Sequence, residues 1–88
     1  MTPFEQVEAA WRICDSIREY GVKEGREIST QEALDKFILV SPDVDIERTR
    51  REAKGNATTR VYLKSPYGIE YREATKAWVP FRHGEVKL

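Results

Sequence analysis

The chain has 88 residues, of which 40% are hydrophobic and 34% are charged, and its formal net charge is zero. This length suits one small domain, and this balance of apolar and charged residues excludes a disordered chain. We therefore expect residues 1–88 to form a single domain.

The charge is divided unevenly along the chain. Residues 1–44 hold five basic and nine acidic side chains, whereas residues 45–88 hold ten basic and six acidic ones. Such asymmetry is typical of a chain that meets a polyanion, or of one whose acidic surface meets a basic partner. The second half is therefore the first place to look for nucleic-acid contacts.

Cys14 is the only cysteine, so one chain cannot form an internal disulfide or a cysteine-based zinc site. The longest apolar run, residues 37–40, is too short to cross a bilayer. The N-terminus lacks the basic region and apolar run of an export signal. We therefore expect a cytoplasmic protein that does not insert into a membrane.

The first predicted helix covers about residues 3–21. Thr2 can serve as its N-cap, Pro3 suits the first helical position, and Glu5 completes the capping pattern. Gly21 and Gly25 are the predicted breaks after it. The apolar residues recur at helical spacing, which predicts a buried stripe that includes the core residues Trp11 and Cys14. The stripe comprises Phe4, Val7, Ala10, Trp11, Cys14 and Ile17.

Two further helices are predicted over about residues 30–39 and 42–54. Ser29 and Thr30 give the second helix a cap, and Ser41 followed by Pro42 gives the third a similar start. Charges in the third helix are ordered so that they complement the helix dipole, with acids first and bases last. The acids are Asp43, Asp45 and Glu47, and the bases are Arg48, Arg50, Arg51 and Lys54.

From residue 58 the apolar period changes to two, which predicts a β-hairpin over about residues 58–74. Residues 65–68 suit a type I turn, because Pro66 presets its own φ and Gly68 can adopt a left-handed conformation. Residues 77–81 could add a third strand, which Pro80 would confine to the sheet edge. The tail, residues 83–88, is predicted to be loose.

The order of three helices followed by a hairpin resembles the winged helix-turn-helix arrangement. The resemblance implies an α+β fold whose third helix enters the major groove of DNA while the hairpin lies along the backbone. Acids at the start of the third helix would repel phosphates, so the contacts are expected from its later residues and from the hairpin. The candidate nucleic-acid-binding residues are Arg48, Arg50, Arg51, Lys54, Arg60, Lys64, Arg72 and Lys76.

Aromatic residues of the second half have two alternative roles. Tyr62 or Tyr67 could pack on a sugar or a base, and Trp78 with Phe81 could form an apolar patch for a protein partner or a second copy of the chain. Equally, Trp78 could belong to the core. The hairpin cations could likewise be a solvated sheet face, paired across strands with Glu70 and Glu73.

No motif in the sequence predicts catalysis, a metal or a cofactor. His83, the only histidine, has neither an orienting partner nor a nucleophile beside it in the sequence. The leading hypothesis is a non-enzymatic DNA-binding accessory or regulatory protein, with DNA favoured over RNA. The alternative is an adaptor or inhibitor, of the kind encoded by mobile elements or phages, that acts on a larger host protein. Zero net charge favours this alternative, because most DNA-binding domains are basic.

Overall fold

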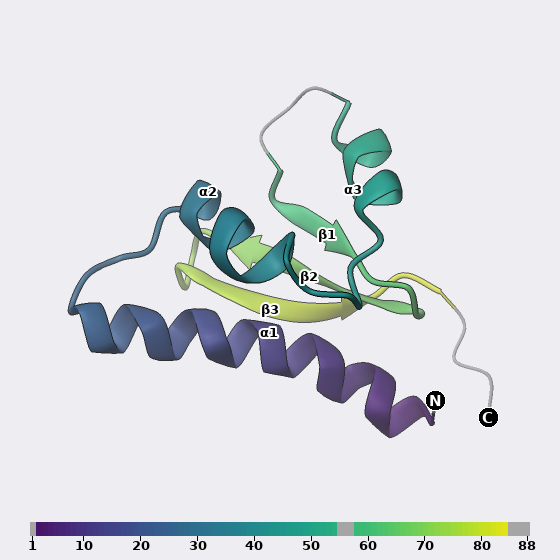
Figure 1. Cartoon of the computed structure of the whole chain (residues 1–88), viewed down its shortest axis with the longest axis horizontal. Helices are drawn as coiled ribbons and strands as arrows, with labels where there is room; N and C mark the ends of the chain where they lie inside the picture. The colour runs from purple at the N-terminus through teal and green to yellow at the C-terminus, as the bar shows by residue number, and fades with distance from the viewer. Residues whose placement is uncertain (1, 55–57, 85–88) are drawn as a thin grey trace.

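Residues 2–54 and 58–84 are described by a computed structural model with three helices and a three-stranded antiparallel sheet (Figure 1). The predicted α+β class is confirmed. The second helix begins as an α-helix and continues as a π-helical segment, η1. In chain order the elements are α1 (Pro3–Glu24), α2 (Thr30–Ala33), η1 (Leu34–Ile38), α3 (Ile46–Ala53), β1 (Arg60–Tyr62), β2 (Tyr67–Arg72) and β3 (Ala77–Arg82).

Helix α1 starts where the sequence predicts but runs beyond Gly21. Thr2 caps it, since the Thr2 hydroxyl accepts a hydrogen bond from the Glu5 amide at 3.2 Å. Gly25 ends the helix in the left-handed conformation, with φ of 67°. The predicted break at Gly25 is therefore confirmed, whereas the predicted break at Gly21 is wrong because Gly21 stays helical.

The second helix occupies the predicted region, but its hydrogen bonding changes along its length. Ser29 caps α2 by accepting from the Glu32 amide at 3.1 Å. From Leu34 onward the turns widen, and the Leu39 amide donates to the Leu34 carbonyl at 2.9 Å, five residues back. Leu34 and Ile38 thereby both become buried.

Helix α3 begins at Ile46, so the predicted start at residue 42 is wrong. Residues 43–45 instead run along the outer edge of β1. The Lys64 amide donates to the Asp43 carbonyl at 2.9 Å, and the Asp45 amide donates to the Tyr62 carbonyl at 2.8 Å. Because these backbone groups find partners in the sheet, the helix can begin only after Asp45, which becomes its N-cap.

The predicted hairpin and third strand are both present, with strand order β1-β2-β3. The predicted turn at residues 65–68 is displaced, because β2 already starts at Tyr67 and Gly68 pairs with Tyr62 inside the sheet. Pro80 lies opposite Ile69 in β3, the edge strand. The prediction of a loose tail is wrong for His83, whose amide donates to the Pro66 carbonyl at 2.8 Å. Residues 85–88 of that tail lie outside the described part.

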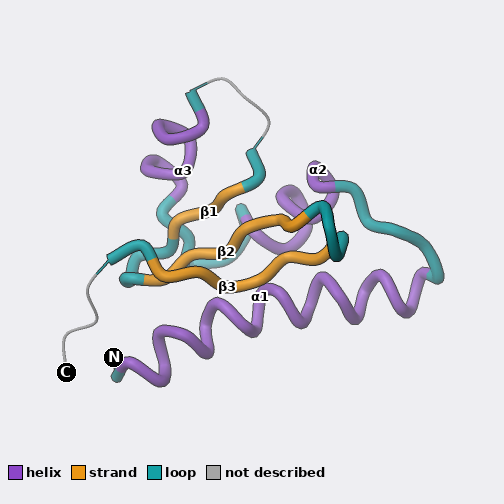
Figure 2. Tube along the Cα trace, turned by 180° about the vertical axis from the view of Figure 1, so that it is seen from behind, coloured by secondary structure: helices purple, strands orange, loops and turns teal. Residues whose placement is uncertain are grey.

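The core lies where α1 and η1 pack on one face of the sheet. Figures 1 and 2 show α1 along the β3 side and α3 beyond β1, with the strands between them. Trp78 joins the core and is 6% exposed, and Cys14 is also buried as predicted. The prediction that Trp11 is a core residue is wrong, since Trp11 is 46% exposed. Within the described residues no helix has both the length and the hydrophobicity that a bilayer crossing requires.

Candidate nucleic-acid interface

The sheet face opposite the core carries several of the predicted contact residues. The register places Tyr62 opposite Gly68, and Gly68 opposite Phe81, so these three residues share one face. Arg60 and its partner Glu70 lie on the same face. We call this face the outer face, because the alternate positions of the strands supply the core. It is defined by Arg60, Tyr62, Gly68, Glu70, Arg72 and Phe81.

Three rings gather at one end of the outer face, and we call Tyr62, Phe81 and His83 the ring cluster. The centroids of Tyr62 and Phe81 are 5.8 Å apart, and those of Tyr62 and His83 are 5.0 Å apart. Gly68 makes this packing possible, because a Cβ at that position would come within 2.7 Å of a Phe81 ring carbon. The rings therefore close over a position where the strand has no side chain.

Two arginines extend over these rings from different elements. The Arg48 guanidinium of α3 lies 4.6 Å from the Tyr62 ring centroid, and that of Arg60 lies 4.8 Å from the Phe81 centroid. Such cation–π contacts hold the guanidinium groups in place while their outer edges stay available to an anion. The ring cluster thus positions one cation from the third helix and one from the hairpin.

Beside the ring cluster the surface forms a hollow of about 530 Å³. Arg48 lines it from α3, Lys64 lines it from the loop between β1 and β2, and His83 lines it from the end of β3. We call this the Arg48 hollow. One carboxylate, that of Asp45, also lines it, but Asp45 already caps α3 by accepting from the Arg48 amide at 3.1 Å. The hollow therefore presents two cations, one imidazole and one carboxylate that already caps α3.

His83 is held neutral by its surroundings. Its Nε2 lies 2.8 Å from the Tyr67 carbonyl oxygen, and since a carbonyl only accepts, Nε2 carries the hydrogen. Burial lowers the pKa of His83 below its usual value, and the positive charge of Arg48 acts in the same direction. The hydrogen bond to Tyr67 opposes this shift without reversing it. The positive charge of the Arg48 hollow therefore comes from Arg48 and Lys64.

At the other end of the outer face the cations are partly neutralised. Glu70 accepts from Arg60 at 3.2 Å and from Arg72 at 3.0 Å. The cross-strand pairing expected for a solvated sheet is therefore present at Glu70. Glu73, the second acid named for such pairing, lies exposed in the turn between β2 and β3.

The remaining predicted residues are scattered. Arg50 and Arg51 are exposed in the last turn of α3, and Lys54 is its exposed C-cap. Lys76 is remote from the outer face, paired with Glu27 at 3.0 Å next to the end of α1. Tyr67 and Trp78 both lie on the core side of the sheet. Of the predicted set, Arg60, Tyr62 and Arg72 lie on the outer face and Arg48 and Lys64 line the adjoining hollow, while the others lie elsewhere.

Sequence reasoning did not assign Gly68, Phe81 or His83 to this site. Alternation within β3 could have placed Phe81 on the same face as Tyr62 only if the register of the third strand had been known. The contact of His83 depends on the chain turning back over Pro66 after β3, which no local pattern specifies. These residues are linked to the site by tertiary contacts alone.

Two further kinds of chemistry in the described part of the chain would need a reactive thiol at Cys14 or a cluster of metal-binding side chains. Burial raises the pKa of the Cys14 thiol to about 12, so the thiol is protonated at neutral pH. Across residues 2–54 and 58–84, no group of three or more potential ligands is placed to hold a metal ion. No family model, curated protein or solved structure matches this chain.

Proposed function

We propose that the chain binds nucleic acid, DNA in particular, through the outer face and the Arg48 hollow, as an accessory or regulatory protein. One observation carries the proposal. Arg48 from α3 and Lys64 from the hairpin loop line the same hollow, beside a cluster of aromatic rings. Cations that contact phosphates next to rings that contact sugars or bases are the usual composition of such interfaces. Tyr62 is only 8% exposed, so contact with a sugar or base falls to the partly exposed rings of Phe81 and His83.

In this proposal the chain uses α3 and the hairpin as a winged helix-turn-helix protein uses its third helix and wing. Arg50 and Arg51 are exposed on the same short helix as Arg48, which is consistent with further phosphate contacts. Asp43 and Asp45 precede the helix, with their backbone engaged with β1, and Asp45 lines the hollow. Their carboxylates would limit affinity, so we expect moderate, strongly salt-dependent binding.

The test is a titration of fluorescent duplex and single-stranded DNA at about 50 mM and about 200 mM salt. We expect saturable binding to duplex that weakens as salt rises. The double variant Arg48→Ala with Lys64→Ala should bind at least about tenfold more weakly, because two phosphate contacts are lost. The matched control is Arg12→Ala with Lys23→Ala, which removes the same charge from α1. Absence of binding at the lower salt, or equal losses in both double variants, would contradict the proposal.

A second candidate, a protein-binding adaptor or inhibitor, is favoured by a different observation. Phe4, Trp11 and Val22 of α1 are 70%, 46% and 78% exposed, respectively. Their spacings of seven and eleven residues place them within about 20° of one another around the helix. An exposed apolar line of this kind is typical of a protein interface. The patch first expected from Trp78 and Phe81 does not form, since the two rings lie on opposite faces of the sheet.

This candidate is tested by comparing partners retained by the wild-type chain and by a Phe4→Ala, Trp11→Ala variant. A stoichiometric partner bound by the first and lost by the second would support it. Sedimentation of both proteins separates a foreign partner from a second copy of the chain. Identical sedimentation as monomers, together with identical binding profiles, would remove α1 from the interface.

A further inference from the structure

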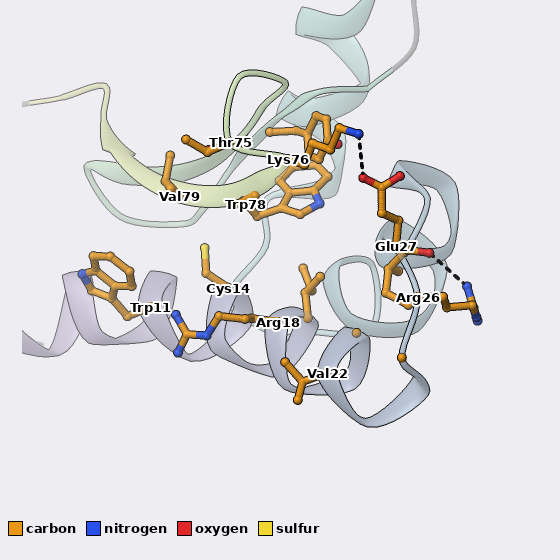
Figure 3. A pocket seen from close by; sticks show the side chains of 16 residues that line it. Trp11, Cys14, Arg18, Val22, Arg26, Glu27, Thr75, Lys76, Trp78 and Val79 are labelled. Atoms are coloured by element: carbon orange, nitrogen blue, oxygen red, sulfur yellow. Dashed lines mark hydrogen bonds and ion pairs between the residues drawn. The ribbon is translucent and has the colours of Figure 1, made fainter.

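A pocket of about 770 Å³ lies between the second half of α1 and strand β3 (Figure 3). Its volume falls in the range of small-molecule sites. Trp11 and Val22 line it from α1, Ile28 from the following connection, and Trp78 and Val79 from β3. It shares no lining residue with the Arg48 hollow. The pocket is therefore a second, separate concavity with a largely apolar wall.

The wall contains one polar atom whose hydrogen-bonding capacity is unused. Trp78 is 6% exposed, and its indole Nε1 is buried without a hydrogen-bond partner among the described residues. Buried tryptophan N–H groups usually have an acceptor, because an unsatisfied donor carries its full desolvation cost. Figure 3 shows this nitrogen on the ring edge that faces Glu27 and the connection after α1. An acceptor that enters from that side would satisfy it.

The charges at the pocket are mostly positive. Arg18, Arg26 and Lys76 line it together with Glu27. Arg18 is paired with Asp15 at 2.8 Å and Arg26 with Glu32 at 2.9 Å, so Lys76 is the lining cation whose partner can be exchanged most easily. Lys76 and Glu27 pair at 3.0 Å, with side chains that are 67% and 71% exposed. An ion pair so exposed to solvent is weak and exchanges its partners readily. A ligand carboxylate could therefore replace Glu27 beside Lys76 at little cost.

We propose that this pocket binds an amphipathic carboxylic acid. The apolar body of the ligand lies between α1 and β3, in contact with Trp11, Val22 and Ile28. Its carboxylate accepts the hydrogen bond from Trp78 Nε1 and takes the place of Glu27 as the partner of Lys76. This assignment explains the unpartnered indole and the apolar wall together.

The first test uses decanoate as the probe, below its micelle-forming concentration, and decanol as the uncharged control. The chain has two tryptophans, so its NMR spectrum holds two indole N–H signals, which the variant Trp11→Phe assigns. We expect decanoate to shift the Trp78 indole proton downfield, saturably, and to bind at least about tenfold more tightly than decanol. Binding that leaves the Trp78 signal unmoved, equal affinity for the two probes, or no binding would overturn the proposal.

Substitutions test separately the two proposed contacts of the ligand carboxylate, with Trp78 Nε1 and with Lys76. Trp78→Phe retains a ring in the core and removes the donor, so decanoate affinity should fall by about tenfold or more. Lys76→Gln keeps the length of the side chain and removes its charge, and should weaken decanoate but not decanol. Lys23→Gln, an exposed residue of α1 that lines neither concavity, is the matched control and should change neither. If Trp78→Phe fails to fold, the indole shift and the Lys76→Gln comparison still decide the matter, and a Lys76→Gln chain that binds decanoate unchanged would contradict the proposal.

Discussion

At the scale of single residues, the site depends on a glycine and a histidine that have no charge of their own to contribute. Gly68 lets the Phe81 ring lie across β2 next to Tyr62. His83, which follows β3, completes the ring cluster. Its amide donates to the Pro66 carbonyl, and its Nε2 donates to the Tyr67 carbonyl. The guanidinium of Arg48 rests on this assembly. The position of the cations therefore depends on neutral neighbours.

Replacing Gly68 by alanine should destabilise the fold. The new Cβ would come within 2.7 Å of a Phe81 ring carbon and closer still to the Val61 carbonyl oxygen, so the ring and the strand must shift. We expect a loss of about 1–3 kcal/mol in the free energy of unfolding, measured with urea. Gly21→Ala is the control, because Gly21 is helical and has more room, and it should cause no loss. Equal stabilities of the two variants would contradict this role for Gly68.

The stability of the protein should fall as the pH drops through the range in which histidine titrates. The folded chain holds the pKa of His83 below its usual value, chiefly by burial, so the unfolded chain takes up a proton first. The contribution of His83 is thus complete above about pH 6.5 and is lost as the pH falls toward the folded pKa. Urea unfolding at about pH 7.5 and 5.5 should show a smaller pH effect in His83→Gln than in the wild type.

The same prediction has a direct spectroscopic check. Since His83 is the only histidine, its NMR titration needs no assignment. A folded-state pKa at or above about 6.5 would show that burial does not govern this side chain.

At the scale of elements, the hydroxyl of one buried threonine of α3 links this helix to β1 by a hydrogen bond. Thr49 is 2% exposed, and its Oγ1 accepts from the Tyr62 amide at 3.0 Å and donates to the Asp45 carbonyl at 2.8 Å. Together with the Asp45 amide, which donates to the Tyr62 carbonyl, it satisfies the backbone of β1 on the side away from β2. These hydrogen bonds hold α3 against β1 and so set the position of Arg48 relative to the strand.

Thr49→Val should therefore cost more than Thr49→Ser. Valine keeps the shape but leaves the Tyr62 amide buried without an acceptor, which costs about 1–3 kcal/mol. Serine keeps the hydroxyl and loses a methyl group, with a cost of about 1 kcal/mol. Urea unfolding measures the loss of stability in both variants. Hydrogen exchange of the Tyr62 amide should be faster than in the wild type for Thr49→Val but not for Thr49→Ser. A valine variant as stable as the serine variant would show that the hydroxyl is not needed.

Local patterns predicted the elements better than their ends. The Thr2 cap and the alternation after residue 58 depend on neighbouring residues, and both predictions agree with the structure. The start at residue 42 was predicted from an equally good cap pattern, yet the β1 edge competes for the same backbone groups. Trp11 was assigned to the core because it fits a helical stripe, but it lies about 100° around α1 from the buried Ala10, at the margin of the buried side. Of the candidate site, the cations could be predicted from the sequence. Gly68 and Phe81 could be placed only once the register of the strands was known, and His83 only once the chain was seen to turn back over Pro66.

At the scale of the whole molecule, charge should limit nucleic-acid binding. The net charge is zero, so the field at long range does not attract a polyanion, and attraction arises only near the cations of the outer face. Four cations lie there or in the adjoining hollow: Arg48 and Lys64 line the hollow, and Arg60 and Arg72 share Glu70, which partly neutralises both.

A plot of log affinity for duplex DNA against log salt should therefore have a slope no steeper than about −5.4, or about −0.9 for each of six phosphate contacts made by these four cations and by Arg50 and Arg51. Glu70→Gln releases Arg60 and Arg72 and should steepen that slope. The matched variant Glu73→Gln removes the same charge from an exposed turn residue and should leave the slope unchanged. A steeper wild-type slope, or equal effects of the two variants, would place the contacts elsewhere.

The edge of β1 that residues 43–45 cover has a consequence for the behaviour of the protein at high concentration. Open sheet edges are templates on which further chains add as strands and grow into fibres. Here the β1 edge is already occupied by the protein's own backbone, and Pro80 removes a donor from β3 at the other margin. A second copy therefore finds no complete ladder to extend at either margin of the described sheet, and the chain can keep a small, highly charged sheet without its becoming a seed for aggregation.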